Sequence, residues 1–558
     1  AVLNYVQRWS DFNSRYSFVI ENFSGDDVMP PDRIYAEAAA AEALSGTLEF
    51  VAVEGGPGTG GLTVPLLRVP QGTMVAVQGG SGGGREALLR MAAGVQEPAD
   101  GRVSFGGSRL IEASLPQIGA SIAFVSAEPG LVSKSVRENL LYGLYRGAPD
   151  LAQQSDVELL MMLDEARRTG NTTADPMGDW VDFGIADVEG AAELDVRLID
   201  LVETVSLSSE VYSDALNMRL DPRRAEEWSG PIMRARDYLR DSGVDLSDLV
   251  EDFDTSGYNR NATLLENVLF ALPVDALEEH GDYARHRAVM DVLTEAGAEQ
   301  EMIAIGWDIA SEFSELVDTL DGDSSVLDSF SGYSKADIMA AHDLVIASAG
   351  QMPTSPKSDD KILLISLAFE FTEVRDRLDV IDDERRGRLL KIRDKSREII
   401  RRRSDFVSFD EERFSPARRV AENILHGERR HDRRSAWKRL EEEIERAVRA
   451  AGLRDDMIRL GLTRQLGSSS GLTSAAKRKI ALVRALLKRP NLLVLDGIAS
   501  TESEADAKLR SAIRLALPGT TIIYAASNQG ATEAADLLAT IGDNGYIETT
   551  KTDAAPGS

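Results

Sequence analysis

Cysteine is absent from the 558-residue sequence. Its absence excludes disulfide bonds, thiol catalysis and zinc sites built on cysteine. Histidine is also scarce, and the five histidines do not show the spacing of metal ligands. No structural metal site is therefore expected.

Long apolar runs and an excess of positive charge are missing as well. No segment approaches the roughly 20 apolar residues that a membrane-spanning helix needs, and no signal segment opens the sequence. The 62 basic side chains are outnumbered by 92 acidic ones, which gives a net charge of −30. Such a chain repels DNA, RNA and anionic lipid. We expect a water-soluble, multidomain protein with no nucleic-acid partner.

Basic side chains are concentrated in residues 384–403. A nucleic-acid surface is one interpretation, but such surfaces interleave aromatic residues that stack on bases, and this segment has none. A solvated helix face that offsets the neighbouring acidic stretch, residues 376–384, is the favoured interpretation.

The N-terminal segment has the pattern of an amphipathic helix. Its apolar residues recur at helical spacing at Leu3, Val6, Trp9, Phe12 and Phe18. The segment is interpreted either as the end of a transmembrane helix or as an ordinary core helix. A polar connector with adjacent prolines follows, so a new domain is expected to begin near residue 47.

A glycine-rich loop follows a strand-like segment. From Gly79 to Gly84 it keeps the G-x-x-x-x-G spacing of a phosphate-binding loop. Such a loop continues with Lys and then Ser or Thr, but here these positions hold Arg85 and Glu86. Arginine is too long and planar to sit in the nest of backbone N–H groups as lysine does. Glu86 replaces the hydroxyl that binds Mg²⁺ and adds negative charge beside the phosphates, although a carboxylate is itself able to ligate a metal.

Strands and helices are expected to alternate on both sides of this loop. Strand-like patterns occur at residues 48–53, 73–77, 492–496 and 520–525. Helical patterns occur at residues 85–93, 475–488 and 505–516. This order predicts an α/β domain with a parallel sheet.

A Glu-Asn pair that leads an apolar turn occurs three times, at Glu138–Asn139, Glu266–Asn267 and Glu422–Asn423. A second element follows each copy, at residues 201–220, 292–306 and 448–461. Short helical segments often match by chance, but paired elements in the same order favour duplication. We therefore predict an acidic, mostly helical insertion over residues 146–413 that contains duplicated helical-arm elements.

Further tracts complete an ordered series of motifs. The most specific one holds Thr473 and Ser474, then a basic run, the sequence Ile-Ala-Leu-Val-Arg-Ala and a buried strand that ends in Asp496. Residues 100–107 and 124–143 add two shorter matches. The series resembles the nucleotide-binding domain of ABC transporters, specifically the exporter type.

The resemblance covers less than half of the chain. It divides the sequence into an N-terminal helix and connector (residues 1–46), the first half of the nucleotide-binding domain (47–145), the insertion (146–413), the second half of the domain (414–548) and a tail (549–558). It implies an α/β, P-loop NTPase-like ABC ATPase fold with a long, mostly α-helical insertion in the helical subdomain.

The resemblance also assigns site positions. Its nucleotide-binding positions fall on Gly79, Gly82, Gly84, Arg85, Glu86, Ala127, Thr473, Ser474 and Asp496. The place of the general base holds Gly497, that of the switch histidine Ser527, and that of the adenine-stacking aromatic Gly55. Asp496 keeps its carboxylate and is the candidate metal ligand. No catalytic residue is expected, and ATP and Mg²⁺ are expected to bind weakly or not at all.

Three functions are compatible with these replacements. The favoured one is a degenerate, inactive ATP-binding cassette domain with a structural or regulatory role in an exporter-like membrane protein. The second is an active or weakly active ATP-binding subunit that drives transmembrane export, and the third is a soluble interaction scaffold. The resemblance implies a transmembrane domain, upstream or separate, and a homo- or heterodimer with another ABC domain at the cytoplasmic face of the inner or plasma membrane.

Overall fold

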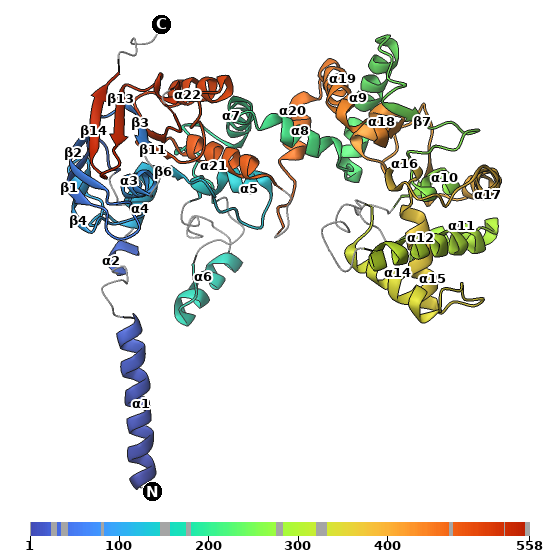
Figure 1. Cartoon of the computed structure of the whole chain (residues 1–558), viewed down its shortest axis with the longest axis horizontal. Helices are drawn as coiled ribbons and strands as arrows, with labels where there is room; N and C mark the ends of the chain where they lie inside the picture. The colour runs from blue at the N-terminus through green and yellow to red at the C-terminus, as the bar shows by residue number, and fades with distance from the viewer. Residues whose placement is uncertain are drawn as a thin grey trace. The chain divides into compact units, whose positions relative to one another are not determined.

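The chain divides into two compact units, which are described separately (Figure 1). Unit 1 comprises Ala1–Glu210 and Leu462–Ser558, and unit 2 comprises Val211–Gly461. The computed structural model describes residues 2–23, 31–34, 43–79, 83–145, 157–173, 180–274, 283–319, 332–467, 472–528 and 530–552.

Unit 1 contains two sheets. Their strands are β1 (Leu48–Glu54), β2 (Thr63–Val69), β3 (Met74–Gly79), β4 (Asp100–Phe105), β5 (Ser108–Arg109), β6 (Ile122–Val125), β11 (Leu492–Leu495), β12 (Thr521–Ala525), β13 (Leu537–Ile541) and β14 (Ile547–Lys551). One sheet has the antiparallel order β2-β1-β4-β5. The other has the order β14-β13-β3-β12-β11-β6 and is parallel except at β14.

The helices of unit 1 are α1 (Val2–Phe23), α2 (Pro31–Ile34), α3 (Gly84–Ala92), α4 (Leu115–Ser121), α5 (Val136–Leu141), α6 (Val157–Thr169), α7 (Ala191–Thr204), α21 (Ser474–Lys488) and α22 (Glu504–Ala516). α3 packs on the middle of the six-stranded sheet, and α21 packs on β6 and α5 (Figure 1). All the strands and helices expected around the glycine-rich loop are present. The buried Leu-Leu-Val-Leu run of β11 explains why its interior place between two parallel strands is readable from sequence.

α1 presents aromatic side chains to solvent. The rings of Trp9, Phe12 and Tyr16 follow one another at 6.0 Å between centroids, and each is more than half exposed. The predicted helix is therefore confirmed, but it is not a buried core helix over this stretch. Among the helices that the structure describes, none combines the length and apolar character required to cross a membrane.

Unit 2 is mostly helical. Its helices are α9 (Pro222–Asp241), α10 (Leu264–Leu269), α11 (Arg287–Ala296), α12 (Glu299–Thr319), α14 (Lys335–Ala347), α15 (Ser358–Glu370), α16 (Glu373–Asp376), α17 (Asp383–Ile400), α18 (Val420–Leu425), α19 (Trp437–Ala450) and α20 (Arg454–Gly461). Its strands are β7 (Val250–Asp252), β8 (Ala271–Pro273), β9 (Phe406–Ser408) and β10 (Gly427–Arg429). α8 (Ser208–Leu216) begins in unit 1 and ends in unit 2.

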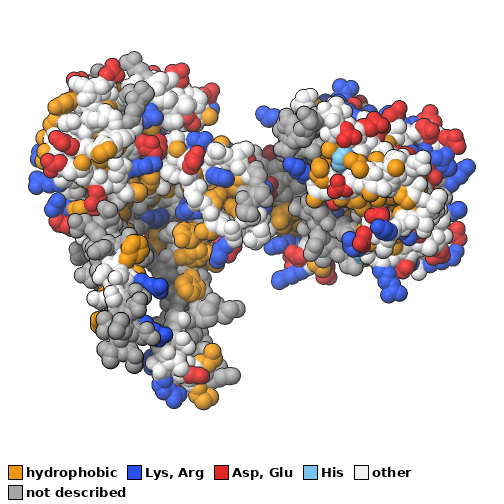
Figure 2. All heavy atoms as spheres, turned by 60° about the horizontal axis from the view of Figure 1, so that its bottom comes forward, with side chains coloured by type: hydrophobic (Ala, Val, Ile, Leu, Met, Phe, Trp, Pro, Cys, Tyr) orange, Lys and Arg blue, Asp and Glu red, His pale blue; other side chains and the backbone are white. Residues whose placement is uncertain are grey.

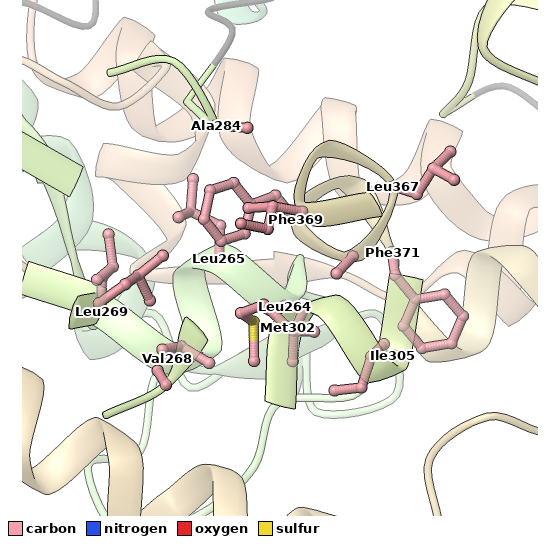
Figure 3. Packing of buried hydrophobic residues seen from close by; sticks show 14 of the residues in the cluster. Leu264, Leu265, Val268, Leu269, Ala284, Met302, Ile305, Leu367, Phe369 and Phe371 are labelled. Carbon is pink, nitrogen blue, oxygen red and sulfur yellow. The ribbon is translucent and has the colours of Figure 1, made fainter. Parts of the chain in front are cut away.

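Two hydrophobic clusters stabilise unit 2. The first joins α10, α11, α12, α14, α15 and α17, and Figure 3 shows Leu264, Met302 and Phe369 within it. The second joins α8, α9, α18, α19 and α20. Several of these helices, such as α10 and α18 with 6 residues each, are too short to be stable alone, so burial in the clusters keeps them folded.

Each Glu-Asn pair lies in a short helix, α5, α10 or α18. Ser135 and Thr263 complete a capping box in α5 and α10, whereas Arg419 at the N-cap of α18 has no side-chain acceptor for one. In each one the glutamate accepts the backbone N–H of the N-cap residue, at 2.9 to 3.1 Å. The asparagine closes the preceding loop by two hydrogen bonds to the backbone of a single residue seven or eight positions upstream. Its Oδ1 accepts the N–H of that residue, and its Nδ2 donates to the carbonyl of the same residue. The sequence repeat thus corresponds to a repeated local structure.

An arginine from another helix supports each asparagine. The Nε atoms of Arg484, Arg393 and Arg236 donate to the backbone carbonyls of Asn139, Asn267 and Asn423 at 2.8, 2.5 and 2.7 Å. These arginines lie in α21, α17 and α9, respectively. The shared geometry supports internal duplication, which remains a prediction.

The two copies in unit 2 exchange their strands. β7 precedes α10 but pairs with β10, which follows α18, whereas β9 precedes α18 but pairs with β8, which follows α10. Gly427 pairs with Asp252 and Ala271 pairs with Ser408, so corresponding members of the two pairs are 156 residues apart. The helices follow the same exchange, since α9 packs on α18 and α17 packs on α10. Unit 2 therefore contains one arrangement twice, each time assembled from both copies.

Two glycines permit equivalent close helix contacts. A Cβ added to Gly306 of α12 would collide with the carbonyl oxygen of Leu364 in α15. A Cβ added to Gly461 at the end of α20 would collide in the same way with the carbonyl oxygen of Val211 in α8. The shared glycine of the second repeated element is thus explained by backbone approach.

Gly306→Ala is expected to lower the free energy of unfolding by about 1–3 kcal/mol, the usual cost of overpacking. The matched control is Gly387→Ala in α17, where an added Cβ meets nothing within 4 Å. Because alanine favours a helix over glycine, the control is expected to gain about 0.5–1 kcal/mol. Urea unfolding followed by circular dichroism measures both variants, and equal stability would contradict the close-contact explanation.

The basic helix α17 is largely neutralised by acidic side chains. Arg385 pairs with Glu301 and Asp308, and Arg386 pairs with Glu373. On the face of unit 2 visible in Figure 2, acidic and basic side chains are intermixed. The interpretation of residues 384–403 as a solvated face that offsets residues 376–384 holds only in part. Arg386 and Arg388 also pair with Asp383 and Glu384, but the other acids come from outside that stretch, and Arg393 is buried.

Candidate functional site

The predicted site positions lie along one edge of the six-stranded sheet. Strands β6, β11, β12 and β3 are parallel neighbours, so the residues that follow them lie at the same edge. Gly79 ends β3, Asp496 follows β11, Ala127 lies two residues beyond β6, and Ser527 lies two residues beyond β12. The structure therefore brings these four positions together.

Backbone geometry explains the glycines of the loop. A Cβ at Gly79 would lie 2.6 Å from the Cβ of Ile541, so the pairing of β3 with β13 requires glycine there. Gly83 is the N-cap of α3 with φ 83°, a left-handed conformation that favours glycine. Gly84 is buried at the start of the helix. Gly82 lies outside the described residues.

Arg85 and Glu86 make different contacts from the first turn of α3. Arg85 is half-buried, and its Nη1 donates to the carbonyl of Ala526 at 3.3 Å. Glu86 is exposed and pairs with Arg90 one helical turn later. The cation that replaces the P-loop lysine is thus held at the end of β12, immediately before Ser527.

Asp496 is a half-buried carboxylate close to a second acid. Burial is the main cause that raises its pKa, the charge of Glu86 raises it further, and Arg85 opposes both effects. The Asp496 N–H donates to the carbonyl of Val125 at 2.8 Å, which fixes the backbone. No cluster of three or more His, Asp or Glu side chains suited to a metal occurs in the described part of the chain.

The raised pKa of Asp496 gives a pH-dependent prediction. In the unfolded chain the Asp496 carboxyl ionises near pH 4, whereas in the folded chain its pKa is higher. The folded state therefore loses stability as the pH rises from the unfolded pKa through the folded pKa. Asp496→Asn removes this cost and is expected to raise the Tm at pH 7. The gain should shrink as the pH falls through the folded pKa and disappear below about pH 3, where the carboxyl is protonated in both states. Thermal unfolding of both chains across this pH range measures the effect, and a gain independent of pH would contradict it.

A side chain at the position of the general base would be crowded. Gly497 has φ 73°, and a Cβ there would lie 3.1 Å from Arg478 Nη1 and 3.1 Å from the Cβ of Ala127. Arg478 Nη1 donates to the Gly497 carbonyl at 2.5 Å. A guanidinium and a methyl group therefore crowd the place where a catalytic carboxylate would be attached.

Two further positions lack the expected chemistry. Ser527 is exposed, and both its N–H and its hydroxyl donate to the carbonyl of Ser500 at 2.8 Å. Ala127 presents only an exposed methyl group. Neither residue offers an imidazole or an amide near Asp496.

Thr473 and Ser474 lie at the start of α21. Thr473 is the N-cap, and its hydroxyl accepts the N–H of Ala476 at 3.1 Å. Both side chains are exposed, and within the described residues neither is hydrogen-bonded to Arg85 or Asp496. Thr473 therefore serves to begin the helix.

A second glycine-rich loop, residues 55–62, lies against the start of α3. A Cβ at Gly55 would collide with the buried Thr59, whose hydroxyl donates to the carbonyl of Gly56 at 2.7 Å. A Cβ at Gly83 would lie 2.7 Å from the carbonyl oxygen of Gly58. The sequence showed only that Gly55 lacks an aromatic ring, whereas the structure shows that no ring fits there. Two features of the sequence indicate this closely packed loop, namely Thr59 and the density of glycines between two strands.

A strand, a glycine-rich loop and a helix at the edge of a parallel sheet define the class of P-loop nucleotide-binding domains. The family model of ABC transporters matches residues 64–208. Residues 64–208 therefore form part of a nucleotide-binding domain of the ABC transporter family, and the expected P-loop NTPase-like fold is confirmed.

Curated relatives agree with this assignment. A putative export ATP-binding/permease protein of Rickettsia bellii is 35% identical over 112 residues, 19% of each chain. An ATP-dependent lipid A-core flippase of Ralstonia nicotianae is 29% identical over 155 residues, covering 28% of this chain and 24% of the relative. The ABC multidrug transporter mdr2 of Aspergillus fumigatus is 36% identical over 85 residues, 14% of this chain and 11% of the relative.

The matched regions span a quarter or less of each of these relatives. A solved structure of a bacterial Atm1-family ABC exporter with ATP bound aligns with this chain at a TM-score of 0.31 and 11% identity. The alignment covers 98% of this chain and 44% of the exporter chain. The fold assignment rests on the strand order and the family match, since a likeness at that level supports no structural argument.

Proposed function

We propose that this chain carries a catalytically silent ABC domain with a structural or regulatory role in an exporter-like membrane protein. The observation that carries the proposal is the crowded, side-chain-free position beside Asp496, where Arg478 donates to the Gly497 carbonyl. Without a carboxylate there, nothing orients and deprotonates an attacking water. The residues present do not fit hydrolysis of ATP with Mg²⁺.

The nucleotide-binding elements support the same proposal. Arg85 is engaged with Ala526, and Glu86 brings negative charge towards Asp496, where phosphates require positive charge. The loop of residues 55–62 closes against α3 and leaves no aromatic platform for a base. Binding and catalysis are thus weakened by separate contacts.

The proposed partner is a transmembrane domain, upstream in the same protein or on a separate chain. The exposed rings of Trp9, Phe12 and Tyr16 on α1 suit attachment near a membrane, because aromatic side chains favour the interface between lipid and water. We place the domain at the cytoplasmic face of a membrane, in a homo- or heterodimer with another ABC domain.

A second candidate function is MgATP binding at the altered loop, which would drive export with a partner. The proximity of two carboxylates, Glu86 and Asp496, favours it, because oxygen ligands of this kind suit Mg²⁺. Light scattering with and without MgATP separates the two candidates. The silent domain is expected to keep its mass, whereas a doubling of mass that Arg85→Ala abolishes would overturn the first proposal.

A further inference from the structure

The sequence of α1 carries a continuous apolar seam. Along its 22 residues, apolar side chains recur at alternating spacings of three and four, at Val2, Tyr5, Trp9, Phe12, Tyr16, Val19 and Phe23. This is the heptad spacing of a coiled coil, in which the seam faces a partner helix. Val6 and Ile20 border the seam in register, whereas Leu3 and Phe18 fall outside it. The spacing therefore marks one face of α1 for contact with another helix.

Within one chain the described part of this seam is open to solvent. Trp9 and Phe12 are each 58% exposed, Tyr16 is 55% exposed and Val19 is 49% exposed. The rings of Trp9, Phe12 and Tyr16 follow one another along the helix at 6.0 Å between centroids. Large apolar side chains aligned in this way are costly to leave in water, so the face favours a partner.

The positions that flank the seam favour a second copy of α1 in parallel orientation. With Trp9 and Tyr16 at heptad position a, Arg8 and Arg15 occupy position g. In a parallel pair position g faces position e of the partner, so that Arg8 faces Asn13 and Arg15 faces Ile20. In an antiparallel pair the g positions face each other, and arginine would approach arginine. Parallel pairing therefore brings no like charges together.

Lipid is the other occupant that exposed rings suit. Helices that lie on anionic lipid carry an excess of lysine and arginine on their polar face. In α1, Arg8 and Arg15 are balanced by Asp11 and Glu21, and the chain as a whole carries a net charge of −30. Electrostatic attraction to lipid is therefore weak, whereas the seam has the spacing of a helix pair.

We propose that two copies of this chain pair in parallel through their α1 helices, with Trp9, Phe12, Tyr16 and Val19 in the seam. The proposal rests on the homodimer of the proposed function and names the contact that joins its two chains. Pairing needs no nucleotide, because the predicted site positions lie outside α1. Parallel helices also suit attachment near a membrane, since both then run in the same direction.

Sedimentation equilibrium of the full chain without nucleotide tests the pairing. We expect a dimer with a Kd of about 50 µM or tighter. Phe12→Ser removes one seam ring from each helix and is expected to weaken the dimer at least about tenfold. The matched control is Phe18→Ser, which removes the same kind of ring at a position outside the seam that is 67% exposed, and it should leave the Kd unchanged. A chain that stays monomeric at about 50 µM, or equal effects of the two substitutions, would overturn the proposal.

The absence of cysteine from the sequence permits a direct test of orientation. In a parallel pair, Val19→Cys places each thiol opposite its counterpart, within the reach of a disulfide. Mild oxidation is therefore expected to crosslink this variant into a dimer, whereas Phe18→Cys should stay uncrosslinked. A dimer of the Val19→Cys chain that does not crosslink, or crosslinks no better than the Phe18→Cys chain, would contradict parallel pairing.

Vesicles of phosphatidylcholine and phosphatidylglycerol test lipid as the occupant. We expect the chain not to sediment with them through its seam rings. A monomeric chain whose binding to vesicles is lost in Phe12→Ser would overturn the pairing. The silent-domain proposal would stand in that case, because it is tested by a separate measurement, the release of phosphate from ATP.

Discussion

Purified chain supplied with ATP and Mg²⁺ is expected to release phosphate no faster than a control without protein. A general base contributes about 10²–10⁴-fold to such a reaction, and here its position is Gly497, which contacts Arg478. The switch position holds Ser527, whose hydroxyl donates to the carbonyl of Ser500. The Q-loop position holds Ala127. A coupled phosphate-release assay measures this rate.

Simple reversion is not expected to restore turnover. The matched control combines Arg85→Lys, Glu86→Ser and Gly497→Glu, which installs the residue types that hydrolysis requires. Because position 497 has φ 73° and lies against Arg478 and Ala127, a glutamate there is strained and displaced. Turnover by the unmodified chain that Asp496→Ala abolishes would contradict the silent-domain account.

Arg393→Ala is expected to lower the free energy of unfolding by about 3–5 kcal/mol, a loss typical of removing a buried charged hydrogen-bonding group. Arg393 is 1% exposed and donates to the carbonyls of Asn267 and Gly257, both at 2.5 Å. Its removal leaves these buried acceptors unpaired and opens a cavity beneath Phe270. Urea unfolding measures the loss.

The control for this variant is Arg402→Ala near the end of the same helix. Arg402 is 70% exposed, and its ion pair with Glu398 contributes less than about 1 kcal/mol. Hydrogen exchange at α10 gives a second readout, because Asn267 depends on Arg393 for its position. Similar stability of the two variants would show that the arginine–asparagine contact does not hold unit 2 together.

Much of unit 1 is predictable because its signals are local. The apolar run of β11 and the strand, loop and helix around Gly79 each occupy a few consecutive residues, and the structure has them where the sequence places them. The chemical losses at Arg85, Glu86 and Gly497 are also visible in the sequence, since each is a change of residue type at a fixed spacing.

The contacts that complete the site are less predictable. The bond from Arg85 to Ala526 and that from Arg478 to Gly497 join residues that are distant in sequence or on different elements. Burial of Thr59 against Gly55 depends on how one loop folds over α3. Such contacts follow from tertiary packing, which residue spacing alone does not specify.

Unit 2 shows the same limit. The repeated Glu-Asn pairs are visible in sequence, and the bond from the N-cap N–H to each glutamate follows from local chemistry. The exchange of β8 and β10 between copies is not visible, because pairing partners more than 130 residues apart leave no local pattern. The equivalence of Arg236 and Arg393 is not visible in sequence for the same reason.

The most direct test of the silent-domain account is titration calorimetry of the chain with ATP and Mg²⁺ up to millimolar concentrations. The account predicts no binding heat, because the aromatic platform, the P-loop lysine and the metal-binding hydroxyl are replaced by Gly55, Arg85 and Glu86. Mg²⁺-dependent binding that is lost in both Arg85→Ala and Asp496→Ala would contradict the account and would show that the altered loop still holds nucleotide.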